Sequence, residues 1–324
     1  MEKNLYPLKF KPIFKEKIWG GRNLETLLER RLPQDKKIGE SWEICDRGED
    51  QSIVENGPFK GKTLHQLISF FGQKLLGNHF QPPFNRFPLL FKIIDAQEDL
   101  SLQVHPNDSY AKAHEKNDSG KTEMWHVIHA EKDAKIYCGL KKGIDKTSFK
   151  TTINQNKIED EVKVYYANTA DTFFIPAGTV HALGKGNVVI EIQQNSDLTY
   201  RLSDWGRIGL DGKLRPLHIE KSLDVIQFQP SKETSLSGKV TRSTLGVECP
   251  YFRVKEEAHQ KPFSESIGNE AFQVWIILEG KGSIAGQPFK KGDFMLIPAH
   301  IGKVAVELEL PLQMLRVLPG NHGE

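Results

Sequence analysis

Short runs of alternating apolar and polar residues make up most of this 324-residue chain, and Gly, Pro, Asn and Asp break them apart. Side chains of a strand point alternately to its two faces, so a period of two predicts strands with one buried face. Many short strands bounded by turn residues are typical of a sandwich or a barrel. The sequence therefore predicts a mainly β fold, with strands over residues 89–94, 100–105, 124–129, 172–175, 188–193 and 274–278.

A few helices are predicted at the periphery of this β scaffold. The clearest begins after Thr63, a suitable N-cap, and Gln66 three residues later completes a capping box. Apolar residues then recur at helical spacing until Gly77, which is a common helix stop. A second helix is predicted after Pro106 and a third over residues 217–226.

Charge and cysteine content exclude several classes of protein. Lys plus Arg (44) nearly balances Asp plus Glu (42), so the net charge of +2 supplies no general field for nucleic acid or a membrane surface. No apolar stretch is long enough to cross a bilayer and no signal peptide is visible, so we expect a cytoplasmic protein. Three widely spaced cysteines indicate neither a disulfide framework nor a thiolate metal site.

An internal repeat predicts two β units. Residues 171–178 resemble residues 293–300, since both are a hydrophobic strand that runs into an Ile-Pro-Ala turn. Residues 123–128 likewise match residues 273–278, and the two matches occur in the same order. A polar, turn-rich stretch near residue 230 supplies a boundary. We therefore expect a first unit over residues 1–230 and a second over residues 231–324.

Four side chains of the first unit form a plausible metal site. Gln103 and His105 lie two residues apart on a predicted strand, so both project from the same face. Glu123 adds a carboxylate, and His181 adds a second imidazole just after a Pro-Gly turn. Two imidazoles, a carboxylate and an amide oxygen suit a divalent ion such as Zn²⁺. Taken singly, each of these residues also has an ordinary explanation as a surface or core residue.

The second copy of the repeat strengthens this interpretation. The four matching positions differ from the proposed ligands, and two of them carry cations that would repel a metal: Arg253, Lys255, Gln273 and Lys303. Packing alone gives no reason for the copies to differ at all four positions while they keep their Trp and their Ile-Pro-Ala turn. We therefore predict one metal site per chain, in the first unit only.

Further charged residues near these ligands could act on a substrate. Lys121 lies two positions before Glu123. The segment that follows His181 supplies Asp197 as a possible acid or base, and Arg201 and Arg207 as planar forks matched to phosphate oxygens. A solvated, charged loop is the alternative interpretation of that segment.

Six ordered motifs resemble the type I phosphomannose isomerases, specifically the short bacterial form. They lie at residues 17–22, 39–43, 99–108, 120–125, 175–183 and 193–201, so the resemblance covers nearly the whole chain. It implies a double cupin, that is, two β-barrel or jelly-roll units of which only the first binds metal. It also implies zinc bound by the four residues named above, Arg201 as an active-site cation, and four further site positions: Ser101, Lys121, Asp197 and Arg207.

Two departures from the longer members of the family limit this resemblance. Those members carry a His immediately before the lysine of the fourth motif, where this chain has Gly120, so a base cannot be assigned to that position. They also have an additional helical domain for which this chain has no room.

The activity implied is the interconversion of mannose 6-phosphate and fructose 6-phosphate through a cis-enediol. Zn²⁺, one per chain, and Arg201 are expected to stabilise the charge that develops on the sugar oxygens. Lys121 and Asp197 are the two candidates for proton transfer. Arg207, with Ser101, is predicted to bind the phosphate.

Two other functions remain open at this stage. Cupin folds also support oxygenases built on histidines and a carboxylate, and a sugar-phosphate sensor could keep the pocket without turnover. In either case the expected partner is a small molecule rather than nucleic acid or a membrane. The chain is expected to be a monomer or a weak homo-oligomer.

Overall fold

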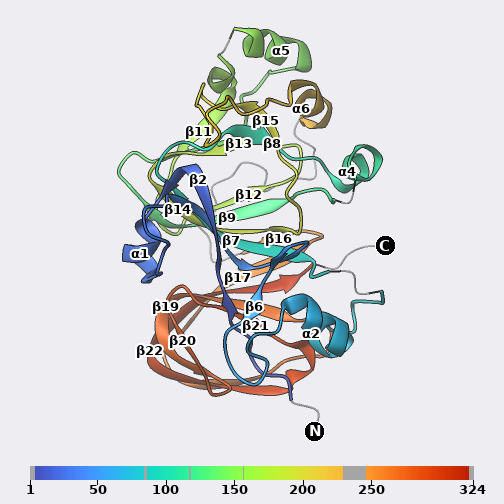
Figure 1. The fold of residues 1–324 in the computed structure, drawn as a ribbon, viewed down its shortest axis with the longest axis vertical. Helices are drawn as coiled ribbons and strands as arrows, with labels where there is room; N and C mark the ends of the chain where they lie inside the picture. Colours follow the sequence, from blue (N-terminus) through green and yellow to red (C-terminus); the bar gives the residue numbers. More distant parts are fainter. Residues whose placement is uncertain (1–3, 84–85, 117, 156, 229–245, 321–324) are drawn as a thin grey trace. The chain divides into compact units, whose positions relative to one another are not determined.

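The computed structural model describes residues 4–83, 86–116, 118–155, 157–228 and 246–320 (Figure 1). The chain forms two compact units: a central unit of Phe14–Ser41 and Lys92–Arg242, and a terminal unit of Met1–Ile13, Trp42–Phe91 and Ser243–Glu324. The boundary predicted at residue 230 lies outside the described residues. The terminal unit also takes in residues 42–91, which the sequence had assigned to the first unit.

Two antiparallel sheets build the central unit. The five-stranded sheet has the order β11 (Val162–Tyr166), β10 (Lys135–Leu140), β13 (His181–Leu183), β8 (Leu102–Val104) and β15 (Tyr200–Ser203). The six-stranded sheet has the order β12 (Thr172–Ile175), β9 (Glu123–Ala130), β14 (Asn187–Gln194), β7 (Leu89–Ala96), β3 (Ile38–Ile44) and β2 (Ile13–Gly21). The mainly β prediction is confirmed, and each predicted strand is present. The strands of the described part of the chain form no closed barrel.

Apolar side chains from both sheets meet in one core. Trp125 of β9 and Phe173 of β12 pack there with Ile136 of β10 and Leu183 of β13. A second apolar cluster covers the other face of the five-stranded sheet, where Phe149 and the residues of two helices join it. Figure 1 shows these helices, α5 and α6, beside that sheet. The five-stranded sheet, which contains the short strands β8 and β13, is therefore packed against apolar clusters on both faces.

The three predicted helices are confirmed. Thr63 Oγ1 accepts a hydrogen bond from Gln66 N, and Gln66 Oε1 accepts one from Thr63 N, so the capping box forms as expected. This helix breaks at Gly72, whose φ of 49° favours glycine, and resumes until Gly77. The helices are α1 (Asn23–Leu28), α2 (Leu64–Phe71), α3 (Gln73–Leu76), α4 (Asp108–His114), α5 (Lys146–Asn154) and α6 (Ile219–Val225), with 3₁₀ turns at Ile158–Glu161 and Ala299–Ile301. In the described residues we find no helix with the length and apolarity that crossing a membrane requires.

A seven-stranded antiparallel sheet dominates the terminal unit. Its main path is β16 (Val247–Glu248), β17 (Phe252–His259), β22 (Lys303–Pro319), β19 (Gln273–Ile284) and β20 (Gln287–Lys290). Two more strands pair at the side: β18 (Phe263–Ser266) with β22, and β21 (Phe294–Ile297) with β19. Two small sheets complete the described elements, β1 (Phe10–Lys11) with β6 (Ile53–Val54) and β4 (Asp46–Arg47) with β5 (Asp50–Gln51).

Strand pairing confirms the internal repeat. In the central unit Glu123 pairs with Ile175 across β9 and β12. In the terminal unit Gln273 pairs with Ile297 across β19 and β21, in the same relative register. The two sequence matches therefore correspond to the same pair of strands in each unit.

The repeat also brings different charges beside the two matched tryptophans. Glu191 lies opposite Trp125 in the central unit, and Arg316 lies opposite Trp275 in the terminal unit. The Arg316 guanidinium stacks 4.7 Å from the centre of the Trp275 ring and binds three acceptors, the carboxylates of Glu257 and Glu265 and the amide oxygen of Gln273. An arginine side chain thus binds the carboxylates at this place in the terminal unit.

Candidate active site

Two histidines and one glutamate converge in the central unit. His105 follows the last residue of β8, His181 begins β13, and Glu123 begins β9, so the two sheets contribute to one cluster. Glu123 Oε2 lies 3.5 Å from His105 Nε2, and Glu123 Oε1 lies 3.3 Å from His181 Nε2. All three side chains are buried. In the described residues, no other group of three or more His, Cys, Asp or Glu side chains has its ligand atoms so close together.

The second ring nitrogen of each histidine fixes its tautomer. His105 Nδ1 lies 2.7 Å from Leu198 O, and His181 Nδ1 lies 2.8 Å from Thr179 O. A carbonyl oxygen only accepts hydrogen bonds, so each Nδ1 must carry the proton and each Nε2 must carry a lone pair. Histidines that bind metals are commonly oriented in this way.

The inward atoms of the cluster lack ordinary partners. His105 Nε2 and Glu123 Oε1 are buried and make no hydrogen bond of regular geometry with the described residues, whereas Glu123 Oε2 lies 2.9 Å from the Lys121 ammonium. Buried polar atoms are rarely left in this state, because each one loses its hydration without replacement. The donor set therefore fits a bound cation.

Gln103 completes the predicted set. Its side-chain amide lies 3.4 Å from His181 Nε2, and its backbone pairs directly with that of His181. Half a turn of the amide exchanges its nitrogen for its oxygen, so the same side chain can supply an oxygen ligand.

Electrostatics hold the cluster in the protonation state that metal binding requires. Burial, assisted by the charge of Lys121, lowers the pKa of His105 to about 3, and burial also lowers the pKa of His181. Burial alone would raise the pKa of Glu123, but the Lys121 ammonium 2.9 Å from Oε2 outweighs it and keeps that pKa well below its usual value. At neutral pH the cluster thus presents neutral imidazoles and an ionised carboxylate.

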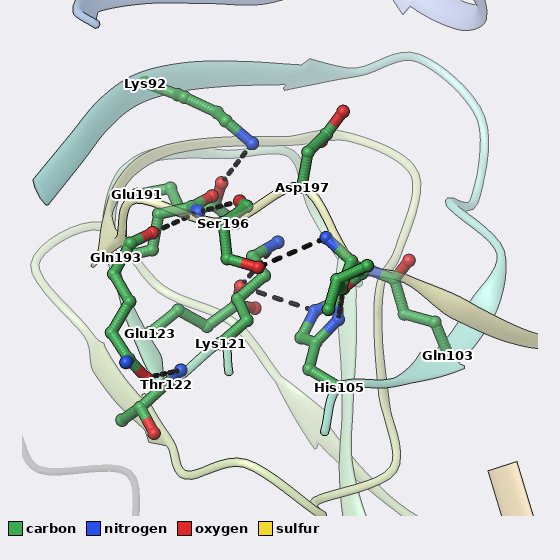
Figure 2. Close-up of polar contacts among 12 residues, drawn as sticks. Lys92, Gln103, His105, Lys121, Thr122, Glu123, Glu191, Gln193, Ser196 and Asp197 are labelled. Atoms are coloured by element: carbon green, nitrogen blue, oxygen red, sulfur yellow. Dashed lines mark hydrogen bonds and ion pairs between the residues drawn. The ribbon is translucent and has the colours of Figure 1, made fainter. Parts of the chain in front are cut away.

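A cleft of about 280 Å³ adjoins this cluster. Five of the residues predicted from the sequence line it: Ser101, Gln103, Lys121, Asp197 and Arg201. His105, Glu123 and His181 are not among the residues that line it, but Gln103, which contacts His181, and Lys121, which contacts Glu123, are. Figure 2 shows Lys121 beside Glu123, and Asp197 on the loop that follows β14.

Arg207, predicted to bind phosphate in this site, lies elsewhere. It is absent from the described residues that line the cleft, and it lines a second cavity of about 530 Å³. Its guanidinium donates to the Asp204 carboxylate and to the carbonyl oxygen of Asp99, which hold it away from the cleft. Arg215 takes its place as a cation that lines the cleft.

Comparison with known proteins identifies the family. A family model of the type I phosphomannose isomerase catalytic domain matches residues 7–124. The mannose-6-phosphate isomerase ManA of Bacillus subtilis is 41% identical over 310 residues, which cover 93% of this chain and 96% of the relative. This chain belongs to the mannose-6-phosphate isomerase family. The probable mannose-6-phosphate isomerase GmuF of the same organism is 35% identical over 93% of this chain and 96% of its own length.

The fold agrees with the family. The crystal structure of mannose 6-phosphate isomerase from Bacillus subtilis superposes with a TM-score of 0.85 at 32% identity, covering 97% of this chain and 99% of that one. A structure from Archaeoglobus fulgidus, at 24% identity and a TM-score of 0.79, shares the fold. The predicted enzyme class, an aldose–ketose isomerase, is confirmed by this membership, which decides against the oxygenase and sensor alternatives.

Sequence reasoning missed a buried ion pair in the wall of the cleft. Lys92 Nζ lies 3.0 Å from Glu191 Oε2, and Trp125 Nε1 donates to Glu191 Oε1 at 2.9 Å. Burial alone would lower the pKa of Lys92, but the carboxylates of Glu191, Glu40 and Asp197 outweigh it and raise that pKa, so the lysine stays charged. A lysine between apolar residues on both sides in β7, Leu89 to Phe91 and Ile93 to Ile94, was the signal that could have revealed this pair.

Proposed function

We propose that this enzyme interconverts mannose 6-phosphate and fructose 6-phosphate with one bound Zn²⁺. The observation that carries the proposal is a cation-binding cluster beside a polar cleft, in a chain of this family. Gln103, His105, Glu123 and His181 would hold the ion. Oxygen and imidazole donors of this kind, with room left for a further ligand, suit zinc in catalytic sites.

The reaction moves a proton between C1 and C2 of the sugar and another between the two oxygens, through a cis-enediol. A bound divalent ion supplies positive charge that stabilises oxygens on which negative charge develops. Arg201 lies directly opposite Gln103 across β15 and β8, so its guanidinium can stabilise the same developing charge.

Proton transfer is assigned to groups that line the cleft. Lys121 and Asp197 are the two candidates, as the sequence suggested. Lys121 is buried and bound to Glu123, whereas Asp197 is exposed at the opening of the cleft. Asp197 is therefore better placed to exchange a proton with solvent, and Lys121 to donate to a substrate oxygen. Ser101 is retained as a substrate contact, while Arg207 is not, because it lies outside the cleft.

Turnover in D₂O tests this proposal. Purified enzyme is incubated with mannose 6-phosphate, fructose 6-phosphate is measured with a coupled assay, and the product is analysed for deuterium at C1. We expect turnover, deuterium incorporation and about one equivalent of zinc per chain. Turnover without any deuterium would contradict proton transfer by a group that exchanges with solvent, such as Asp197, and the absence of turnover by the zinc-loaded enzyme would overturn the proposed activity.

The metal assignment has its own test. Dialysis against a chelator is expected to abolish turnover, and Zn²⁺ is expected to restore it. Full activity in a chelated protein shown to be metal-free would contradict a metal-dependent reaction. The cytoplasmic location and the monomeric or weakly oligomeric state remain predictions.

A further inference from the structure

The carboxylate of Asp204 lies between two guanidiniums. Arg207 Nη2 donates to Asp204 Oδ1 at 2.7 Å, and Arg215 Nε donates to Asp204 Oδ2 at 2.8 Å, while Arg215 Nη2 also reaches Oδ1. Asp204 is almost fully buried, at 6% exposure. Both arginines line the second cavity, but only Arg215 also lines the catalytic cleft.

Arg201 offers unused donors beside Arg215. Its Nη1 donates to Pro216 O at 2.9 Å, and its Nε is buried without a hydrogen-bond partner among the described residues. Arg215 uses Nε and Nη2 on Asp204, which leaves its Nη1 without a hydrogen bond to the described part of the chain. Guanidinium donors on two adjacent residues are therefore available to one oxyanion.

Positive charge exceeds negative charge at this end of the cleft. Arg201, Arg207 and Arg215 outnumber the two carboxylates near them, Asp204 and Glu98. Burial together with the charges of Arg215 and Arg207 lowers the pKa of Arg201. The lysines of the cleft differ, because each has its own carboxylate: Lys17 lies 3.1 Å from Glu40, and Lys92 lies 3.0 Å from Glu191.

We infer that Arg215, oriented by Asp204, binds the phosphate of the substrate together with Arg201 and so determines specificity for phosphorylated hexoses. This inference rests on the proposed function and names the phosphate end of the same site. Arg201 lies opposite Gln103 across the strand pair, and Arg215, whose side chain binds Asp204 rather than the cluster, lines the same cleft. Asp204 acts on the substrate only through Arg215 and is a positioning residue.

The backbone after Asp204 fixes this arrangement relative to the cleft. Trp205 has a φ of 57°, a conformation that bulky residues rarely adopt, and its indole Nε1 donates to Leu100 O at 2.7 Å. Leu100 and its neighbour Ser101 line the cleft. The turn that carries Asp204 is therefore tied to the cleft wall, and Asp204 in turn limits the rotamers of Arg215. A side chain that is already ordered before the ligand binds loses less conformational entropy on binding.

Steady-state kinetics of Arg215→Ala test the inference, with Lys213→Ala as the matched control. Lys213 is an exposed cation in the same loop that lines neither cavity, so its removal changes the net charge equally. We expect Arg215→Ala to raise KM for mannose 6-phosphate and the inhibition constant of inorganic phosphate by about 10- to 100-fold, with a smaller change in kcat. Lys213→Ala should change both by less than about threefold, because exposed charges act weakly.

Two more variants separate contact from positioning. Arg215→Lys should recover part of the loss, since it keeps the charge without the fork. Asp204→Asn should raise KM by a smaller factor than Arg215→Ala with little change in kcat, and Arg207→Ala should raise KM by less again. An unchanged KM and phosphate inhibition constant in Arg215→Ala would overturn the inference, as would an equal rise in Lys213→Ala.

The outcome is distinguishable from failure of the proposed function. If the wild-type enzyme does not turn over mannose 6-phosphate, calorimetric titration with inorganic phosphate still compares wild type with Arg215→Ala. Weaker phosphate binding in the variant supports the inference, and equal binding overturns it.

Discussion

Replacing Glu123 by Gln removes the only negative charge among the four proposed ligands. The other three donors are the neutral imidazoles of His105 and His181 and the amide of Gln103. The replacement keeps the size of the side chain and one oxygen, so it tests charge rather than packing. Glu123 is fully buried, so water cannot readily take the place of the lost carboxylate oxygen.

The size of the effect follows from sharing the metal's binding energy among its ligands. Structural zinc sites bind with about 10–16 kcal/mol, so one ligand of four contributes about 3 kcal/mol. A loss of about 3 kcal/mol weakens binding by about 10²-fold. Glu123→Gln should therefore lose most of its metal at a chelator concentration that leaves the wild-type enzyme loaded.

Competition titration against a chromophoric chelator measures this affinity, and elemental analysis gives the metal content. Glu191→Gln is the matched control, because Glu191 is a buried carboxylate on the neighbouring strand β14 that is bound to Lys92 rather than to the histidines. We expect the control to keep its metal. A Glu123→Gln protein that binds one equivalent with wild-type affinity would refute the assigned ligand set.

Three further predictions concern stability. Lys92→Met leaves the Glu191 carboxylate buried without its ion-pair partner and should lower the free energy of unfolding in urea by about 3–5 kcal/mol. Adding Glu191→Gln should recover most of this loss. A coupling energy between the two substitutions below about 1 kcal/mol would argue against the pair. Burial lowers the pKa of His126 to about 4. Between pH ~6.5 and pH ~4 the unfolded chain therefore binds a proton that the folded chain does not. The free energy of unfolding should fall as the pH falls through this range, by about 2 kcal/mol at pH 5. His126→Gln in metal-free protein should remove this part of the acid sensitivity, and an unchanged pH slope would contradict the assignment. Arg316→Met leaves the Glu257 carboxylate without its guanidinium partner, so it should reduce hydrogen-exchange protection in β17 and β22. The metal content should not change. A loss of bound metal would contradict a purely structural role of Arg316.

Local sequence patterns determined the elements and much of the cluster of His105, Glu123 and His181. The strand period of two places alternate side chains on one face, and capping residues such as Thr63 and Asn107 fix where helices begin, because these effects act within a few residues. The proposed ligand positions stood out in the sequence because the second copy of the repeat lacks them. The helices α1 and α5 were missed, since neither carries a strong amphipathic pattern and tertiary contacts hold them.

Only the tertiary structure decided which charges line the cleft. Arg207 and Arg215 are the same residue type in one loop, and their sequence neighbourhoods do not distinguish the arginine that lines the cleft from the one that does not. The difference arises because Asp204 binds both, while the carbonyl oxygen of Asp99, distant in sequence, holds Arg207 on the far side. Residues far apart along the chain come into contact only when the sheets pair and pack. The period and spacing of residues in the sequence therefore do not predict such contacts.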